Sequence, residues 1–202
     1  MAKYPLFIDL EEKTIVIIGG GKVAAGKAER LRAFTSNILV VANETEIDFV
    51  PVIRRSYTEE DIIRGDIIIA ATGDPDTDKK IAEEAKKLGK AVNVASDPDL
   101  GNFYMPAVIK RGDVVIGVST NGTSPAFARY LKEEIESHLP EYTALISLEM
   151  TKLRDALKSK VTDQESRKKI YKNALRELLE EENITEEKAE TIITKILKEM
   201  DR

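Results

Sequence analysis

The sequence contains no cysteine, no tryptophan and only one histidine, His138, among its 202 residues. The absence of cysteine excludes disulfides, thiolate metal ligands and cysteine nucleophiles, and a single histidine cannot form a histidine-built metal cage. Any chemistry must therefore use carboxylates, hydroxyls, amines or a bound cofactor.

Long apolar runs and strongly basic stretches are also missing. No apolar run approaches the roughly 20 residues that a bilayer-spanning helix needs, and the first residues, MAKYPLFIDL, lack a signal-peptide layout. The formal net charge is −5, which argues against nucleic acid as the main partner. These features predict a cytoplasmic protein that does not bind membranes or nucleic acid.

The most informative feature present is the segment TIVIIGGGKVA at residues 14–24, an apolar strand that runs into a glycine-rich turn and a helix start. Gly19 can form the tight turn, Gly21 lets the backbone approach a pyrophosphate, and the small Ala24 allows close packing of helix on strand. The diphosphate is expected at the helix N-terminus, beside Lys22 and Val23, where unpaired N–H groups and the helix dipole favour an anion. The alternative is a glycine-rich loop that only turns a corner.

The surrounding pattern favours a dinucleotide site. Residues 13–18 and 37–42 are typical of buried strands, and residues 23–33 of a helix, which together make one β-α-β unit. Asn43 and Glu44 follow the second strand, where such folds bind the adenosine ribose. A carboxylate at Glu44 repels a 2′-phosphate, so NAD is favoured over NADP. Arg54 and Arg55 on the next strand could reach across, and Glu44 could instead be a solvated loop acid.

The remaining pattern predicts an α/β fold, with a Rossmann-type parallel sheet followed by an all-helical C-terminal part. Strands are expected at residues 52–54, 66–71, 91–95 and 113–119. Thr77 is expected to cap a helix over 78–88, and Ser124 with Pro125 to begin a helix that ends near Leu139. From Glu141 onward only helices are expected, with a capping box formed by Thr162 and Glu165.

Ligands of an open parallel sheet bind outside the carboxyl ends of its strands. Thr72 follows the strand at 66–71, and Ser96 and Asp97 follow the strand at 91–95, so a cofactor is expected beside Thr72, Val94 and these two residues. The turn from Gly122 to Ser124 precedes another helix and suits a carboxylate or phosphate. The alternatives are structural: Asp97 before Pro98 is a common turn former, and Thr123 and Ser124 are common caps.

These residues resemble the precorrin-2 dehydrogenase family, the N-terminal module of siroheme synthases, along essentially the whole chain. The resemblance lies in five ordered segments: YPLFIDL at 4–10, VIIGGGKVAAGKAERL at 16–31, AATGD at 70–74, NVASDPDLGNFYMPA at 93–107 and VSTNGTSPAFARYLKEEIE at 118–136. It implies a homodimer that oxidises precorrin-2 to sirohydrochlorin with NAD, and some members of the family also insert ferrous iron. It also implies an NAD-binding Rossmann domain at 1–112, a dimerisation region at 113–145 and a helical domain at 146–202.

One departure from the family concerns the catalytic carboxylate. The family typically has aspartate where this chain has Ser96, with Asp97 one residue later. Asp97 and Ser96 are therefore the candidate catalytic residues, with Asp97 as the candidate base. Such a base would be a buried carboxylate whose pKa is raised by desolvation. Thr120 stands where relatives often have serine. Because the substrate carries many carboxylates, Arg129 and Lys132 are expected to bind it together with Gly122, Thr123 and Ser124, although Arg129 could equally be an ordinary exposed helix residue.

Two further functions are compatible with the motifs. A nucleotide fingerprint alone permits a non-catalytic NAD-sensing regulatory module, and the helical tail permits an interaction protein. A homodimer is also expected from the apolar residues on several faces of the helix after Ser124, including Phe127, Tyr130 and Leu131.

Overall fold

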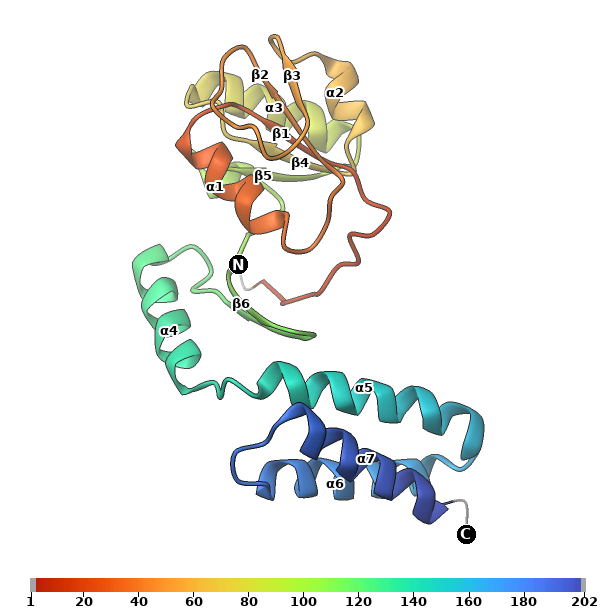
Figure 1. The fold of residues 1–202 in the computed structure, drawn as a ribbon. Coiled ribbons are helices and arrows are strands. Elements are labelled where there is room, and N and C mark those ends of the chain that lie inside the picture. The colour runs from red at the N-terminus through yellow and green to blue at the C-terminus, as the bar shows by residue number, and fades with distance from the viewer. Residues whose placement is uncertain (1–2, 201–202) are drawn as a thin grey trace. The chain divides into compact units, whose positions relative to one another are not determined.

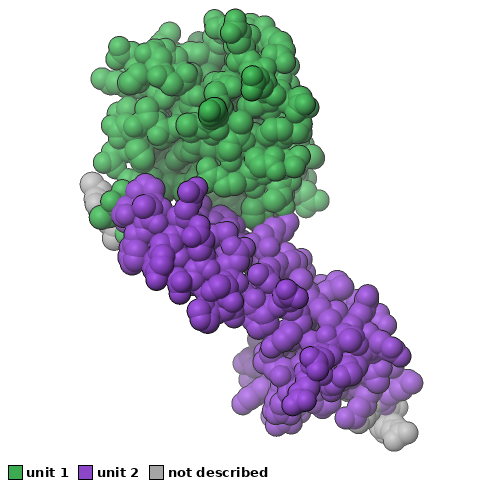
Figure 2. Space-filling model, turned by 60° about the vertical axis from the view of Figure 1, so that its left-hand side comes forward, with its two compact units in different colours: residues 1–105, 121–123 green, residues 106–120, 124–202 purple. Residues whose placement is uncertain are grey.

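The computed structural model describes residues 3–200 (Figure 1). The chain forms two compact units, coloured separately in Figure 2. The first holds the described residues up to Met105 together with Asn121–Thr123, and the second holds Pro106–Thr120 and the described residues from Ser124 onward. The three-part division expected from the resemblance stays a prediction.

The first unit is built on a five-stranded parallel sheet with strand order β3-β2-β1-β4-β5. Its strands are β1 (Ile15–Ile18), β2 (Ile38–Ala42), β3 (Val52–Arg54), β4 (Ile67–Ala70) and β5 (Ala91–Val94). The order reverses between β1 and β4, so the topological switch point, where such sheets bind their ligands, lies at the end of β1.

Helices cover both faces of this sheet. Ala24 and Ala28 of α1 (Lys22–Leu31) pack with Ile15 and Ile17 on one face. The other face is covered by α2 (Glu59–Arg64) and α3 (Pro75–Lys87), and a short 3-10 helix, η1 (Pro98–Leu100), follows β5. Because both faces are buried, β1 and β4 are continuous apolar runs rather than alternating ones.

The second unit contains an antiparallel hairpin and four helices. The hairpin pairs β6 (Ala107–Arg111) with β7 (Val114–Val118) across Gly112, whose φ of 59° is in the left-handed region that glycine adopts readily. The helices are α4 (Pro125–His138), α5 (Thr143–Lys160), α6 (Gln164–Glu180) and α7 (Glu186–Met200). The last three enclose an apolar cluster that includes Leu153, Leu157 and Leu178.

The predicted α/β class and helical C-terminal part are confirmed, but two predicted helix caps were wrong and two elements were missed. The strand β6 and the short helix α2 were not predicted. Asp74, not Thr77, caps α3, because its carboxylate accepts the Thr77 N–H and the helix starts at Pro75. Asp163, not Thr162, caps α6 through the N–H groups of Glu165 and Ser166. No helix in residues 3–200 is both long and apolar enough to span a membrane.

Candidate dinucleotide site

The turn after β1 is so tightly packed that only glycine fits its first two positions. Gly19 has φ of +127°, and a Cβ there would lie 2.0 Å from the Ala71 carbonyl oxygen. A Cβ on Gly20 would lie 2.2 Å from the Glu44 carbonyl oxygen. These contacts bring the turn against the loops after β4 and β2, as the tight-turn role predicted for Gly19 requires.

Gly21 differs from its two neighbours. A Cβ on Gly21 would meet no protein atom within 4 Å, and its φ of −81° is open to any residue. Gly21 is also the N-cap of α1; it offers no capping side chain, and the first turn carries no acidic residue. The start of α1 thus has an uncapped N-terminus with open space beside Gly21, which suits a diphosphate. Lys22 and Val23 are exposed at this helix end, as expected.

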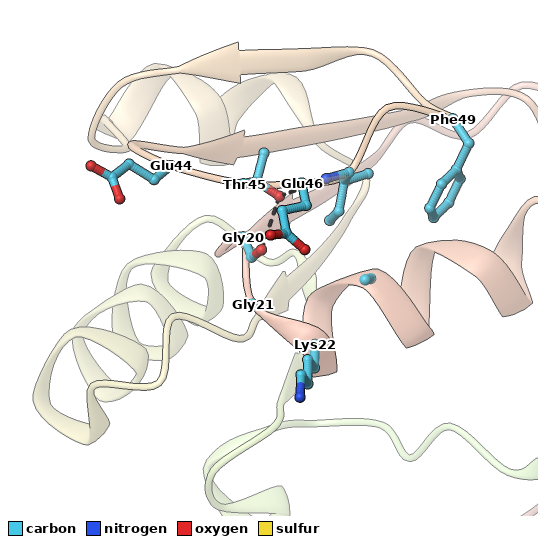
Figure 3. A pocket seen from close by; sticks show the side chains of 9 residues that line it. Gly20, Gly21, Lys22, Glu44, Thr45, Glu46 and Phe49 are labelled. Atoms are coloured by element: carbon cyan, nitrogen blue, oxygen red, sulfur yellow. Dashed lines mark hydrogen bonds between the residues drawn. The ribbon is translucent and has the colours of Figure 1, made fainter.

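A cavity of about 570 Å³ adjoins the turn (Figure 3). It lies between the start of α1 and the loop after β2, and Thr45 ties the two together by donating its hydroxyl to the Gly20 carbonyl at 2.9 Å. Its lining residues are Gly20, Gly21, Lys22, Ala25, Glu44, Thr45, Glu46, Ile47 and Phe49. The cavity combines backbone and carboxylate groups at one wall with apolar side chains at the other, as a nucleoside needs.

Two carboxylates, Glu44 and Glu46, and one ammonium, Lys22, line this cavity, so its charge is acidic by one unit. Glu44 and Phe49 lie at its opposite ends, and the Glu46 side chain reaches toward the glycine turn (Figure 3). Glu44 is exposed at the end of β2, where a ribose-binding acid was predicted. Asn43 lies beside it and accepts a hydrogen bond from the Ser56 hydroxyl at 3.1 Å.

The two arginines that could bring positive charge to this cavity are held elsewhere. Arg55 forms a two-pronged ion pair with the buried Asp61, at 2.6 and 2.9 Å. The same hydrogen bonds hold the pKa of Asp61 below its ordinary value. Arg54 donates to the Thr45 carbonyl at 3.0 Å. Both guanidinium groups thus stabilise loops in this structure.

The carboxyl ends of β4 and β5 are joined by a carboxylate that was not among the predicted site residues. Asp78 of α3 is fully buried and accepts three hydrogen bonds. They come from the Thr72 N–H at 3.0 Å, the Thr72 hydroxyl at 2.7 Å and the Ser96 hydroxyl at 2.8 Å. Thr72 and Ser96, both predicted site residues, are therefore brought together. The Val94 side chain is 1% exposed and packs in the core, so only the Val94 backbone is available to a ligand.

Asp97 is exposed, so its expected burial is wrong. Its carboxylate accepts the Asp99 N–H at 3.0 Å and caps η1, because the chain leaves the strand after Val94 and turns outward. Asp99 in turn accepts the Tyr104 hydroxyl at 2.6 Å. The assignment of Asp97 as the base stays a prediction, and the burial that was expected to favour it is absent.

Lys27 is the one buried cation among the described residues of this unit. It lies on α1 with 8% of its surface exposed, and no carboxylate among residues 3–200 pairs with it. Its ammonium donates to the Asn93 side-chain oxygen at 2.7 Å, and the Met105 sulfur lies 3.6 Å away. Burial, reinforced by the charge of Arg30, lowers the pKa of Lys27 to about 8.

The sequence carried a signal for both missed residues. Lys27 lies three residues after Ala24 and one before Ala28, which places it on the core face of α1. Asp78 lies three residues before Ile81 on the core face of α3. A charged residue at a core position of an amphipathic helix marks a buried polar contact.

The predicted substrate-binding residues do not share one environment. Gly122 and Thr123 belong to the first unit, where a Cβ on Gly122 would meet the Tyr104 ring at 3.0 Å. Ser124 belongs to the second unit; its hydroxyl accepts the Phe127 N–H at 3.2 Å and caps α4. Its own N–H donates to the Thr120 hydroxyl at 3.0 Å, which supports the structural alternative of a cap.

The two predicted cationic residues on α4 differ in their exposure and in their ion pairs. Arg129 is exposed and has no ion-pair partner in the described part of the chain. Lys132 is partly buried and paired with Glu136 one turn further along. Arg129 is thus the more available of the two for an anionic ligand. No cluster of three or more His, Asp or Glu side chains that could hold a metal occurs among residues 3–200.

Comparison with known families covers most of the chain. The family described as "Putative NAD(P)-binding" matches residues 6–107, half of the 202 residues. The chain belongs to this NAD(P)-binding family. The family described as "Sirohaem biosynthesis protein central" matches residues 111–138, immediately after it. Membership of the NAD(P)-binding family supports a nicotinamide cofactor for this chain.

Similar proteins include the siroheme synthase of Nitrosomonas eutropha, which is 30% identical over 184 residues, 87% of this chain and 39% of the relative. Siroheme synthase 2 of Aeromonas hydrophila is 29% identical over 176 residues, 84% of this chain and 37% of the relative. The chain thus spans about two fifths of the length of these relatives. The solved structure of SirC, precorrin-2 dehydrogenase, matches with a TM-score of 0.74 and 23% identity, covering 97% of this chain and all of that one.

Proposed function

We propose that this chain oxidises precorrin-2 to sirohydrochlorin with NAD as the hydride acceptor. The observation that carries the proposal is the open space at Gly21, at an uncapped helix N-terminus beside a nucleoside-sized cavity. The similarity to siroheme synthases and to a precorrin-2 dehydrogenase structure supports the choice of substrate. When bound, the nicotinamide takes up the hydride, while the protein positions both reactants.

NAD is proposed rather than NADP because of the charges around the cavity. The Glu44 and Glu46 carboxylates line it, and Arg55, which could neutralise a 2′-phosphate, is held by Asp61. A phosphate with about two negative charges beside two carboxylates is unfavourable, whereas ribose hydroxyls can donate to Glu44.

The proton released with the hydride is proposed to leave through the loop after β5. Ser96 and Asp97 are the predicted site residues of this loop, and both are exposed just after β5. Asp97 is a carboxylate in contact with solvent, and Ser96 is a hydroxyl that already donates to Asp78.

The carboxylates of the substrate are proposed to bind the Gly122–Ser124 turn together with Arg129 and Lys132. Arg129 offers five N–H donors that no other described group occupies, and Lys132 can exchange its bond to Glu136 for one to a ligand. A cytoplasmic homodimer is part of the proposal. Iron insertion stays a prediction of the resemblance alone.

The test is an anaerobic assay with purified protein, NAD and precorrin-2. The proposal predicts NADH absorbance at 340 nm that rises in step with sirohydrochlorin and requires both reactants. A chain that binds NAD but forms no NADH would be a regulatory module, and one that binds neither ligand would leave the helical part as the functional one.

A further inference from the structure

Asp78 forms a buried connection between two loops at the ligand-binding edge of the sheet. It is 0% exposed, and all three of its hydrogen bonds are donated by Thr72 and Ser96. These residues follow neighbouring strands, β4 and β5, whose last residues Ala70 and Val94 are paired in register. The carboxylate therefore lies behind the edge where a nicotinamide is expected.

The donors that Asp78 binds are uncharged. No lysine or arginine among residues 3–200 forms an ion pair with it. Its negative charge is balanced by a backbone N–H, two hydroxyls and its place in the first turns of α3, where the helix dipole favours an anion. No ion pair therefore holds the Asp78 carboxylate, and its partners are the donors at the ends of β4 and β5 alone.

Ser96 connects this buried carboxylate to the outside. Its hydroxyl gives its only hydrogen to Asp78 at 2.8 Å, while the residue itself is exposed. The oxygen lone pairs of Ser96 are thus available to accept a proton from a bound molecule, because a hydroxyl donates once and accepts twice. Thr72 cannot do this as readily, since its hydroxyl oxygen already accepts the Asp74 N–H at 3.1 Å.

We propose that Ser96 and Asp78 form a proton relay for the oxidation, with Ser96 as the catalytic residue and Asp78 as a positioning residue that acts through it. The inference rests on the proposed function. A C–H bond of the substrate breaks and its hydride passes to the oxidised nicotinamide, which becomes NADH. An N–H or C–H proton of the substrate passes to the Ser96 oxygen, while the Ser96 hydroxyl hydrogen moves to the Asp78 carboxylate.

The cycle closes when Asp78 returns this proton through Ser96 to solvent after product release. The substrate loses two electrons and two hydrogens in total, NAD gains the hydride, and one proton is released. Asp97 lacks this arrangement, because its carboxylate is in solvent, accepts the Asp99 N–H and has no bond to the buried Asp78.

The experiment compares Asp78→Asn, Ser96→Ala, their double variant and Asp76→Asn. Asp76 is an exposed acid two residues earlier on α3 and serves as the matched control. Wild-type protein must first form NADH with precorrin-2; if it does not, the proposed function fails, whatever the relay does. Given wild-type turnover, the relay predicts that kcat falls about 100-fold or more in each single variant. The KM for NAD should stay within about threefold, and Asp76→Asn should match wild type.

Two further comparisons separate a relay from a structural role. The double variant Asp78→Asn with Ser96→Ala should lose no more activity than either single variant, because a relay fails as a unit. The exchange Asp78→Asn with Ser96→Asp places a carboxylate one hydrogen bond closer to the substrate and should recover at least about tenfold in kcat over Asp78→Asn. Should Asp78→Asn fail to fold, Ser96→Ala decides, because it leaves the bonds between Asp78 and Thr72 in place. A kcat within about threefold of wild type in either single variant, or losses that multiply in the double variant, would overturn the relay.

Discussion

The Lys27 ammonium donates to the Asn93 side chain at 2.7 Å, which joins helix α1 to strand β5 across the buried interior of the first unit. The Asn93 amide donates onward to the Phe103 carbonyl at 3.1 Å. The helix that begins at Gly21 and the loop that carries Ser96 and Asp97 are therefore fixed by one chain of hydrogen bonds.

Stability should rise with pH because of Lys27. Its pKa in the folded protein is about 8, against an ordinary value of 10.5. Between these values the unfolded chain holds a proton that the folded one has lost, so the free energy of unfolding increases with pH, by up to about 1.4 kcal/mol per unit. The measurement is urea unfolding over a range of about three pH units, from about pH 7.5 to about 10.5. The free energy of unfolding should rise with pH in wild type, and this rise should be absent in Lys27→Met.

The control for this measurement is Lys79→Met, at an exposed position of α3. It should keep the wild-type slope. Equal slopes in wild type and Lys27→Met would show that folding does not lower the pKa of Lys27.

Cofactor preference should depend on Glu44. Replacing Glu44 by Gln removes a negative charge from the cavity, so the ratio of kcat/KM for NAD to that for NADP should fall by about tenfold. Asp48→Asn changes an exposed acid of the same loop outside the cavity and should leave the ratio unchanged. A wild-type preference for NADP, or an unchanged ratio in Glu44→Gln, would contradict the proposed ribose contact.

Asp97 should contribute little to turnover if the proton leaves through Ser96. Asp97→Asn keeps an oxygen that can accept the Asp99 N–H and removes only the charge. We expect kcat within about threefold of wild type, because a general base normally contributes 100-fold or more. A loss of two orders of magnitude in steady-state NADH formation would make Asp97 the base after all.

The exposed aromatic side chains of α4 should mediate self-association. Phe127 and Tyr130 are 52% and 55% exposed and stack with ring centroids 6.3 Å apart. Light scattering should give a dimer for wild type at micromolar concentration and a monomer for Tyr130→Glu. Ile63→Glu, at a similarly exposed apolar position of α2, should remain dimeric. A wild-type monomer, or a dimeric Tyr130→Glu, would exclude this surface as the interface.

The sequence predicted the sheet well because its strands are buried on both faces and so consist of continuous apolar runs such as IVII and IIIA. Prediction from the sequence failed where tertiary contacts determine the local structure. The strand β6 carries only one buried residue, Ile109, and forms because β7 folds back onto it through Gly112. Thr77 and Asp74 are both good caps by residue type, and the choice of Asp74 depends on how the chain leaves β4.

In the candidate site, too, residues of a local motif could be predicted, whereas residues that meet only through tertiary contacts could not. Gly19, Gly21 and Glu44 follow a motif with fixed spacing, so the tight turn at Gly19 and the places of Gly21 and Glu44 beside the cavity could be predicted. Asp78 could not be assigned to Ser96 from sequence, because the two lie 18 residues apart and meet only through the pairing of β4 with β5.

The most direct test of the account is NAD binding measured by titration calorimetry on wild type, Gly21→Ala and Gly26→Ala. A Cβ meets no protein atom within 4 Å at either glycine, so both variants should fold. Only Gly21 faces the expected diphosphate. The account predicts a measurable heat of binding with equal affinity in wild type and Gly26→Ala, and an affinity at least about tenfold weaker in Gly21→Ala, a loss of about 1.4 kcal/mol. Equal affinity in Gly21→Ala and Gly26→Ala, or no heat of binding in wild type, would contradict it.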